Sequence, residues 1–230
     1  MTTPGDAVVV EAFSADGALQ LRSTMAAGVL HGLLEEFDGA GNLAMSAQFE
    51  QGKLHGPMTL YGDGGALVQR SVFRHGRPHG LFETFVNGRR VAARTMSDGL
   101  ASGPSLSFDE AGQMTARLHL VAGQIDGPAA FFHEGRQVRT AAYRAGLLDG
   151  ESVDCDAEGQ VVQRCGYRAN LLHGALRRYW PNGALMEETM YQDGVPLAPP
   201  TRFDEQGRAL GRVQAPPALF ERLKRLVRGE

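Results

Sequence analysis

The chain has 230 residues, a formal net charge of −3, 30 glycines and only 7% aromatic residues. Because nucleic-acid binding needs clustered Lys and Arg, this charge argues against nucleic acid as a partner. The sequence holds no apolar run long enough for a transmembrane helix, and its start, Met1–Asp6, lacks the basic and apolar segments of a signal peptide. We therefore expect a cytoplasmic protein, and two cysteines are too few to predict a disulfide scaffold.

A short motif near the N-terminus, Gly28-Val-Leu-His-Gly32, recurs along the chain. The later copies begin at Gly52, Gly76, Gly99, Gly123, Gly146 and Asn170. The second glycines of the copies follow one another at intervals of 24, 24, 23, 24, 23 and 24 residues. A fixed period of about 20 to 50 residues indicates a repeat architecture.

A second turn signal lies between the copies of the first and keeps the same period. It comprises Asp16-Gly17, Ala40-Gly41, Gly64-Gly65, Asn87-Gly88, Ala111-Gly112, Glu134-Gly135, Glu158-Gly159, Asn182-Gly183 and Gln206-Gly207. Asn-Gly, Asp-Gly and Gly-Gly pairs are typical of hairpin turns, whose central residues need positive φ. Each period thus holds two turns, and the segments between them, five to eight residues long, have the length of strands.

Alternation of apolar and polar residues supports the strand assignment. In the fourth hairpin, Leu106, Phe108, Leu118 and Leu120 alternate with polar residues such as Ser107. A period of two with one apolar side predicts an antiparallel sheet. The 23-residue units omit one residue near Asn87-Gly88 and Glu134-Gly135, so we expect those two hairpins to differ locally.

The last repeat is degenerate, and the pattern changes after Pro216-Pro217. There, Leu219, Phe220, Leu223, Leu226 and Val227 have helical spacing. We expect a repeat array over residues 1–213 and a short amphipathic helix over 214–230 that caps it. The helix also carries Arg222, Lys224, Arg225 and Arg228, which would suit an anionic membrane, but capping is the favoured interpretation.

The segment Arg178–Gly194 reads Arg-Tyr-Trp-Pro-Asn-Gly-Ala-Leu-Met-Glu-Glu-Thr-Met-Tyr-Gln-Asp-Gly. An aromatic residue, Asn-Gly, Leu, a second strand ending in Tyr, and then Gly resemble the bacterial variant of the MORN repeat. The resemblance covers roughly residues 8 to 213 and departs from the pattern at Ser102 and Cys155. It implies an elongated stack of hairpins that serves as a scaffold or binding surface. Bacterial members are often grouped as YwqK-type antitoxins, immunity partners of secreted toxins, and lipid binding is a further suggestion for MORN proteins.

Histidines occupy one position of the repeated motif, at His31, His55, His79 and His173, which invites a metal-binding interpretation. Successive repeats lie two strands apart, about 10 Å, whereas ligands of zinc lie about 2 Å from one ion. Neighbouring histidines of this row therefore cannot share a metal. Asp126 and Asp149 replace His in the same position, as expected for a side chain that bonds to its own turn.

The two cysteines flank the Glu158-Gly159 turn and are expected to point to the same face. Pairing about that turn places Cys155 opposite Val161, so Cys165 should lie about 13 Å from Cys155. A disulfide needs Cα atoms within about 7 Å. We expect two free thiols.

Two columns of large side chains recur, one five residues after each second glycine and one three residues before each first glycine. Taken singly, each such residue is more often core than ligand contact. A meander of eighteen strands would span roughly 85 Å, however, and a capping helix about 18 Å long cannot cover it. Either the sheet curls and shelters its own apolar face, or another molecule covers that face. The candidate partner-binding face comprises Phe37, Phe49, Tyr61, Phe73, Phe85, Phe108, Phe132, Tyr143, Tyr167, Tyr179 and Tyr191.

No catalytic motif is present, and Gly62-Asp-Gly64 precedes no helix, so it is not a phosphate loop. Glu35, Glu83 and Glu187, which we expect on the inner face, would mark either a polar groove or a concave face that is partly exposed to water. We predict an all-β, elongated, single antiparallel meander of about nine hairpins, without catalytic residues, metal or cofactor. The predicted function is that of a non-enzymatic protein-binding repeat protein, an antitoxin or immunity protein that occludes a toxin. The alternative is a structural scaffold or a peripheral lipid-binding module.

Overall fold

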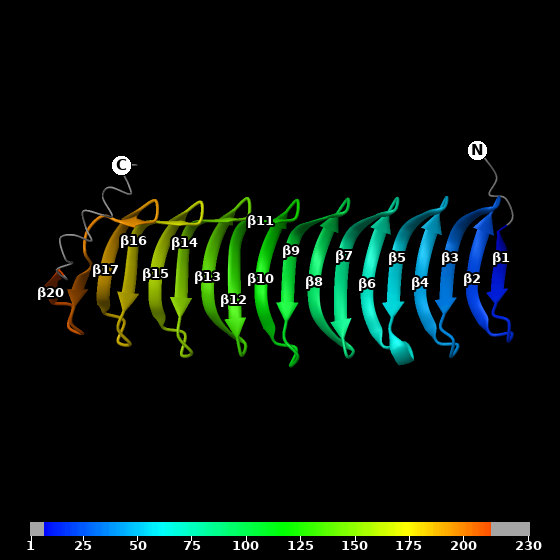
Figure 1. The fold of residues 1–230 in the computed structure, drawn as a ribbon, viewed down its shortest axis with the longest axis horizontal. Coiled ribbons are helices and arrows are strands. Elements are labelled where there is room, and N and C mark those ends of the chain that lie inside the picture. Colours follow the sequence, from blue (N-terminus) through cyan, green and yellow to red (C-terminus); the bar gives the residue numbers. More distant parts are fainter. Residues whose placement is uncertain (1–6, 213–230) are drawn as a thin grey trace. The chain divides into compact units, whose positions relative to one another are not determined.

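The computed structural model describes residues 7–212, and these residues form an open antiparallel sheet with very little helix (Figure 1). The strands are β1 (Val8–Phe13), β2 (Leu19–Ala26), β3 (Val29–Phe37), β4 (Leu43–Glu50), β5 (Lys53–Tyr61), β6 (Leu67–Arg74), β7 (Arg77–Val86), β8 (Arg89–Ser97), β9 (Leu100–Phe108), β10 (Met114–Val121), β11 (Gln124–Ile125), β12 (Gly127–His133), β13 (Arg136–Arg144), β14 (Leu147–Cys155), β15 (Val161–Arg168), β16 (Leu171–Tyr179), β17 (Leu185–Gln192), β18 (Val195–Pro196), β19 (Thr201–Phe203) and β20 (Ala209–Arg212). A single 3-10 turn, Asp63–Gly65, interrupts them.

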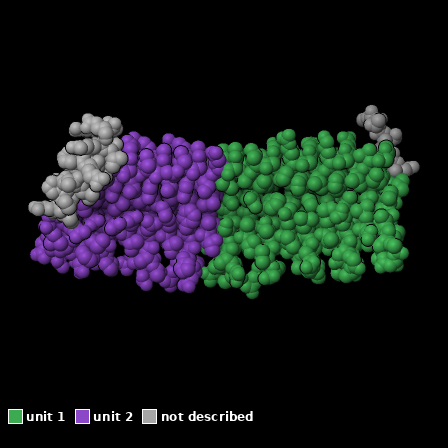
Figure 2. Space-filling view, viewed as in Figure 1, with its two compact units in different colours: residues 1–114, 120–123 green, residues 115–119, 124–230 purple. Residues whose placement is uncertain are grey.

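The strands follow one another as a meander, so the predicted all-β antiparallel fold is confirmed. The chain consists of two compact units, shown in green and purple in Figure 2. Unit 1 comprises residues 1–114 and 120–123, and unit 2 comprises residues 115–119 and 124–230. The capping helix predicted over 214–230 lies outside the described residues. No helix in the described part of the chain is long and apolar enough to cross a membrane.

One edge of each unit is built from two-residue turns. Ala27 and Gly28 both have positive φ, 51° and 78°, as a type I′ turn requires. The same pairing of a left-handed residue with glycine recurs at Gln51, His75, Asp98, Ala122, Ala145 and Asp193. The turns are tied to the preceding repeat, since the Gly76 N–H donates to the Leu54 carbonyl over 2.8 Å.

The recurring motif is therefore only partly a turn, which corrects the sequence interpretation. Gly28 ends the type I′ turn, whereas the following residues through Gly32 already belong to β3. β2 therefore has eight residues, the upper limit of the predicted five to eight, and β7 has ten, which exceeds it. Gly32 has a φ of 115° within a strand, where the ladder with β2 slips, so this glycine serves a bulge.

The opposite edge carries longer hairpin loops held by side chains. In the loop after β3, Asp38 Oδ1 accepts hydrogen bonds from the N–H groups of Ala40 and Asn42 at 2.9 and 2.8 Å. Gly41 has a φ of 81°, and this left-handed backbone conformation lets the loop turn back into β4. Equivalent aspartates hold the later loops at Asp109, Asp156 and Asp204.

The two 23-residue units replace this loop by a two-residue turn. Val86 pairs with Arg89 around Asn87-Gly88, and Asn87 and Gly88 both have positive φ. His133 and Arg136 flank Glu134-Gly135 in the same way. The predicted local difference at these hairpins is confirmed, because omission of one residue converts the longer loop into a type I′ turn.

A β-bulge precedes the loop edge in the hairpins. Glu36 pairs with Met45, whereas the next residue, Phe37, pairs with Leu43, which leaves Ala44 without a partner. An extra residue on one strand bends the ladder and increases its twist. The same slip occurs beside Phe13, Tyr61, Phe85, Phe132, Cys155, Tyr179 and Phe203.

Candidate functional site

The strand register separates two faces within each unit, because directly opposed residues of antiparallel strands point to the same side. We call core face the side that carries the following opposed residues. They are Ser23, Leu34, Ala47, Met58, Ser71 and Phe82 in unit 1, and Ala129, Ala141, Ser152, Cys165, Leu176 and Thr189 in unit 2. The other side of each unit is its outer face.

The row that defines the core face is the most deeply buried part of the protein. Ala47, Ser152 and Cys165 are 1%, 0% and 2% exposed. Since the described residues form only strands, loops and the turn Asp63–Gly65, neighbouring side chains and the arch of the strands shelter this row (Figure 1). Of the two alternatives for the apolar face, self-sheltering therefore holds for this central row.

Sequence reasoning missed this row because most of its members are small, although Leu34, Met58, Phe82 and Leu176 also belong to it. The available signal was a small side chain two residues before each member of the second large column. It recurs every 24 residues as Ser23, Ala47 and Ser71, and again as Ala141, Cys165 and Thr189. Small residues at the strand centres allow large side chains to close over the row from either side.

The second predicted aromatic column lies on the core face, beside the buried row. Phe49 lies directly opposite Gly32, and Tyr167 lies directly opposite Gly150. Phe73, Tyr143 and Tyr191 face Gly56, Gly127 and Gly174 in the same way. These aromatic residues are half-buried, so this column is mainly structural.

The first predicted aromatic column lies on the outer face instead. Phe85 is two residues from Glu83, and the guanidinium of Arg70, the residue opposite Glu83, lies 5.8 Å from the Phe85 ring centroid. By the same alternation Phe37, Tyr61, Phe108, Phe132 and Tyr179 also point outward. The prediction that all eleven residues form one partner-binding face is thus wrong. At Phe37 and Phe49 the two columns are an even number of positions apart, but the bulge at Ala44 shifts the alternation by one residue, so they point to opposite sides.

Arginines cover two of the outer aromatic rings in unit 1, those of Phe85 and Phe108. The Arg90 guanidinium lies 4.9 Å from the centroid of Phe108, a cation–π distance. Arg90 also forms an ion pair of 2.9 Å with Glu83, whose carboxylate is mostly buried. The outer face of unit 1 therefore combines planar apolar groups with cations whose side chains are partly exposed.

An exposed apolar strip runs along the same outer face of unit 1. We call outer strip the residues Leu33, Pro57, Val72, Leu81 and Pro104, all exposed to solvent. Leu33, Pro57, Leu81 and Pro104 each follow the second glycine of a repeat, and Val72 lies directly opposite Pro57. Leu81 is 49% exposed. No described element of unit 1 covers this strip.

The glutamates predicted to share the inner face are divided between the two faces. Glu35 and Glu83 lie on the outer face, where Glu35 is 3.6 Å from Arg22. Glu187 lies on the core face of unit 2, between Arg178 at 3.7 Å and Arg202 at 3.0 Å. It belongs to a charged row that also contains Arg139, Asp154 and Gln163.

The motif histidines lie in strands, and both His79 and His173 contact the turn of the following repeat. The Asp98 N–H donates to His79 Nδ1 at 3.5 Å, and His173 Nδ1 lies 3.2 Å from Asp193 Oδ1. Asp126 replaces the histidine and accepts from the Ala145 N–H at 3.0 Å. The expected bond to its own turn is therefore wrong at Asp126, where the next type I′ turn is the nearer partner, whereas Asp149 lies 3.5 Å from Arg144, which flanks the turn before Asp149.

The two cysteines are free and lie on opposite faces. Cys155 opposes Val161, as predicted, but strand alternation places it on the outer face, whereas Cys165 belongs to the core face. The predicted common face is wrong for the same reason as the aromatic columns. Burial raises the pKa of the Cys165 thiol and is also the main cause that raises the pKa of Tyr167.

The shortened turn at Asn87-Gly88 leaves a hollow on unit 1. It has a volume of about 570 Å³ and is lined by Val86, Asn87, Arg89, Val91 and Glu110. The Arg89 guanidinium donates a hydrogen bond to the Glu110 carbonyl across it. Arg136, which follows the other shortened turn, donates a hydrogen bond to the Ala157 carbonyl. The two 23-residue units therefore share this arginine–carbonyl hydrogen bond.

No family model matches the chain, and no curated protein matches it. A crystal structure of the S. aureus TarM G117R mutant, in complex with fondaparinux, alpha-GlcNAc-glycerol and UDP, is 14% identical over 38% of this chain, with a TM-score of 0.29. A second TarM structure is 15% identical over 39% of this chain, with a TM-score of 0.29. The matched part spans 18% of TarM in both cases.

Proposed function

We propose that this chain is a non-enzymatic, protein-binding repeat module of the bacterial MORN type. The observation that carries the proposal is the outer strip of unit 1, whose exposed apolar side chains lie on β3, β5, β6, β7 and β9. Apolar surface of this kind marks sites of interaction more often than free surface. Because the core face shelters its own central row, the outer face has the stronger physical reason to take a partner.

The chemistry of the outer face suits a protein partner. Leu81 and Val72 supply apolar contact area, and the stacked pair Arg90 and Phe108 supplies the residue types that dominate protein interfaces. Binding there would occlude the covered surface of the partner without any chemical step. We further propose that the partner is a toxin or effector that the chain neutralises in the cytoplasm, a compartment suited to its two free thiols.

The proposal is tested by affinity capture from the native source, with two tagged baits. One bait is the wild-type chain, and the other carries Val72→Ser and Leu81→Ser on the outer strip. We expect one protein to be enriched in stoichiometric amount by the wild type and at least about tenfold less by the variant, since two buried aliphatic anchors contribute more than 1.4 kcal/mol. The enriched protein is then purified and mixed with each bait to reconstitute the complex.

A control variant with Leu171→Ser, an exposed residue of unit 2, should capture the partner as the wild type does. Equal capture by the outer-strip variant would contradict the proposed surface. Failure to capture any protein, together with flotation of the chain on anionic vesicles, would favour a peripheral lipid-binding module instead.

A further inference from the structure

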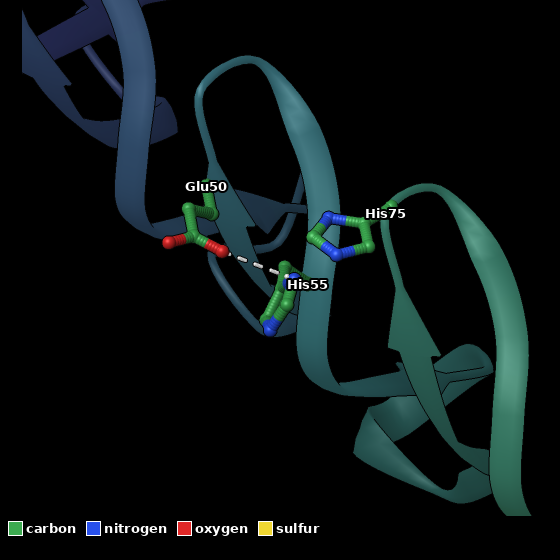
Figure 3. Close-up of side chains that lie close together, drawn as sticks. All are labelled: Glu50, His55 and His75. Carbon is green, nitrogen blue, oxygen red and sulfur yellow. Dashed lines mark ion pairs between the residues drawn. The ribbon is translucent and has the colours of Figure 1, made fainter.

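Three side chains that could ligate a metal lie together at the turn edge of unit 1. Glu50 ends β4, His55 lies in β5, and His75 is the left-handed residue of the turn between β6 and β7. One ligand atom from each lies within 4.8 Å of the others, and no other group of three His, Cys, Asp or Glu residues in the described part of the chain comes as close. Figure 3 shows the three side chains side by side.

The repeat geometry brings these residues together. The type I′ turn between β4 and β5 pairs Glu50 with Lys53, so Glu50 and His55 lie on the same side of adjacent strands. The hydrogen bond from the Gly76 N–H to the Leu54 carbonyl then holds the next turn, and with it His75, beside His55. The backbone positions of all three ligands are thus fixed by ladder and turn hydrogen bonds.

The observed distances require little adjustment to accept an ion. His55 Nδ1 lies 3.1 Å from Glu50 Oε2, close to the spacing of about 3.3 Å between neighbouring ligands of a tetrahedral zinc ion. The His75 ring centroid lies 4.9 Å from that of His55. The ligand atoms all lie within 4.8 Å of one another, at most about 1.5 Å beyond that spacing. Because His75 is exposed, rotation of its side chain can close this gap.

The His55 imidazole also has an unused nitrogen. Its Nδ1 is buried and, although close to Glu50, has no hydrogen bond of acceptable geometry among the described residues. A buried polar atom without a partner is costly, and a metal ion would satisfy it. At the equivalent places of other repeats, His79 and His173 face the aspartates Asp98 and Asp193 rather than a second imidazole.

We propose that Glu50, His55 and His75 form a site for a divalent transition-metal ion such as Zn²⁺. Two imidazoles and one carboxylate are ligands that this class of ion prefers. The fourth coordination position would be open to water or to a side chain of another molecule. The proposal concerns the turn edge of unit 1 and does not depend on the outer strip.

The site is tested by calorimetric titration of the purified full chain with Zn²⁺, and by the visible absorption of bound Co²⁺. We expect one zinc ion per chain and a Co²⁺ spectrum of tetrahedral type. His75→Asn should reduce the affinity for zinc at least about tenfold, since loss of an outer-shell partner alone costs that much. Asn is suited to this turn, because Asn87 occupies the same first position of a two-residue turn, with a φ of 51°.

His31→Gln is the matched control, because His31 occupies the same repeat position as His55 but its neighbouring turn carries Gln51. Its zinc affinity should equal that of the wild type. Glu50→Gln is a second variant, and it changes a strand residue rather than a turn residue. It should also weaken the binding of zinc. Zinc should raise the unfolding temperature of the wild type and not that of His75→Asn. No binding by the wild type, or equal binding by His75→Asn, would overturn the proposal.

Discussion

Tyr167 lies directly opposite Gly150 across the ladder of β14 and β15. The same relation joins the second glycine of a repeat to the large residue that ends the next strand in both units. An aromatic side chain opposite a strand glycine covers backbone that the glycine leaves bare. The strand glycine and the aromatic residue opposite it therefore act together to cover the backbone of the sheet.

Gly150→Ala should destabilise the protein strongly. Gly150 has a φ of 124°, and an added Cβ would lie 2.8 Å from the Cβ of Ala142. A left-handed residue with a side chain and an overpacked contact together cost about 2–4 kcal/mol of unfolding free energy. Urea unfolding measures the loss.

Gly39→Ala serves as the control for this substitution. Gly39 is not in the left-handed region, and an added Cβ would have no neighbour within 4 Å. Its unfolding free energy should stay within about 0.5 kcal/mol of the wild type. A similar loss in both variants would contradict the role assigned to Gly150.

Leu34 and Leu33 are adjacent in β3 but lie on opposite faces, so they test the two faces directly. Leu34 is 7% exposed on the core face, and Leu33 is 38% exposed on the outer strip. Leu34→Ala should cost about 2–4 kcal/mol of unfolding free energy, because a buried side chain is truncated. Leu33→Ala should cost less than about 1 kcal/mol. Equal losses in urea unfolding would mean that the two faces are not distinguished as described.

Cys165 should react much more slowly with a thiol reagent than Cys155. Cys165 is almost fully buried, and this burial raises the pKa of its thiol, so little reactive thiolate forms near neutral pH. Cys155 is only half-buried and lies on the outer face. Mass spectrometry after timed alkylation of the native protein distinguishes the two sites. If both cysteines were modified at the same rate in the folded protein, the assignment of Cys165 to the buried row would be contradicted.

The hairpin loop at Asp38 should lose stability in acid. Hydrogen bonds from the Asn42 side chain, and then from the Asn42 backbone N–H, lower the pKa of the Asp38 carboxyl below its usual range. A lowered pKa contributes stability above the ordinary aspartate value of about 3.9, and this contribution disappears as the pH falls through the lower folded-state value. The urea midpoint of the wild type should therefore drop between about pH 6 and about pH 3 more than that of Asp38→Asn.

Asp63→Asn is the control, since Asp63 lies in the loop of the next hairpin, one position after Gly62, the equivalent of Asp38. It should show the wild-type drop in the urea midpoint. If Asp38→Asn behaved like Asp63→Asn, the loop hydrogen bonds would not be the source of the pH dependence.

Much of the fold could be predicted because glycine turns carry a direct conformational signal. The period, the antiparallel meander and the anomaly at Asn87-Gly88 all follow from residues that need positive φ. The two faces could not be separated in the same way. Phe37 and Phe49 are both large and both recur every repeat, yet only the register of β3 with β4 shows that they point to opposite sides.

The candidate sites were less predictable because they depend on contacts between repeats. His55 belongs to the recurring motif, whereas His75 lies in a turn, and nothing in their spacing of 20 residues reveals that they meet. The hydrogen bond from the Gly76 N–H to the Leu54 carbonyl brings the two histidines together, and only the three-dimensional structure shows it.

The central claim is that the outer face of unit 1 is the open, partner-binding surface while the core face shelters itself. Hydroxyl-radical footprinting of the free chain, and of its complex with the captured partner, tests this most directly. In the free chain we expect Leu33, Val72 and Leu81 to be modified and Leu34 to be protected, with the first three becoming protected in the complex. Unchanged modification of the outer strip in the complex, with new protection at Tyr167 on the core face, would contradict the claim.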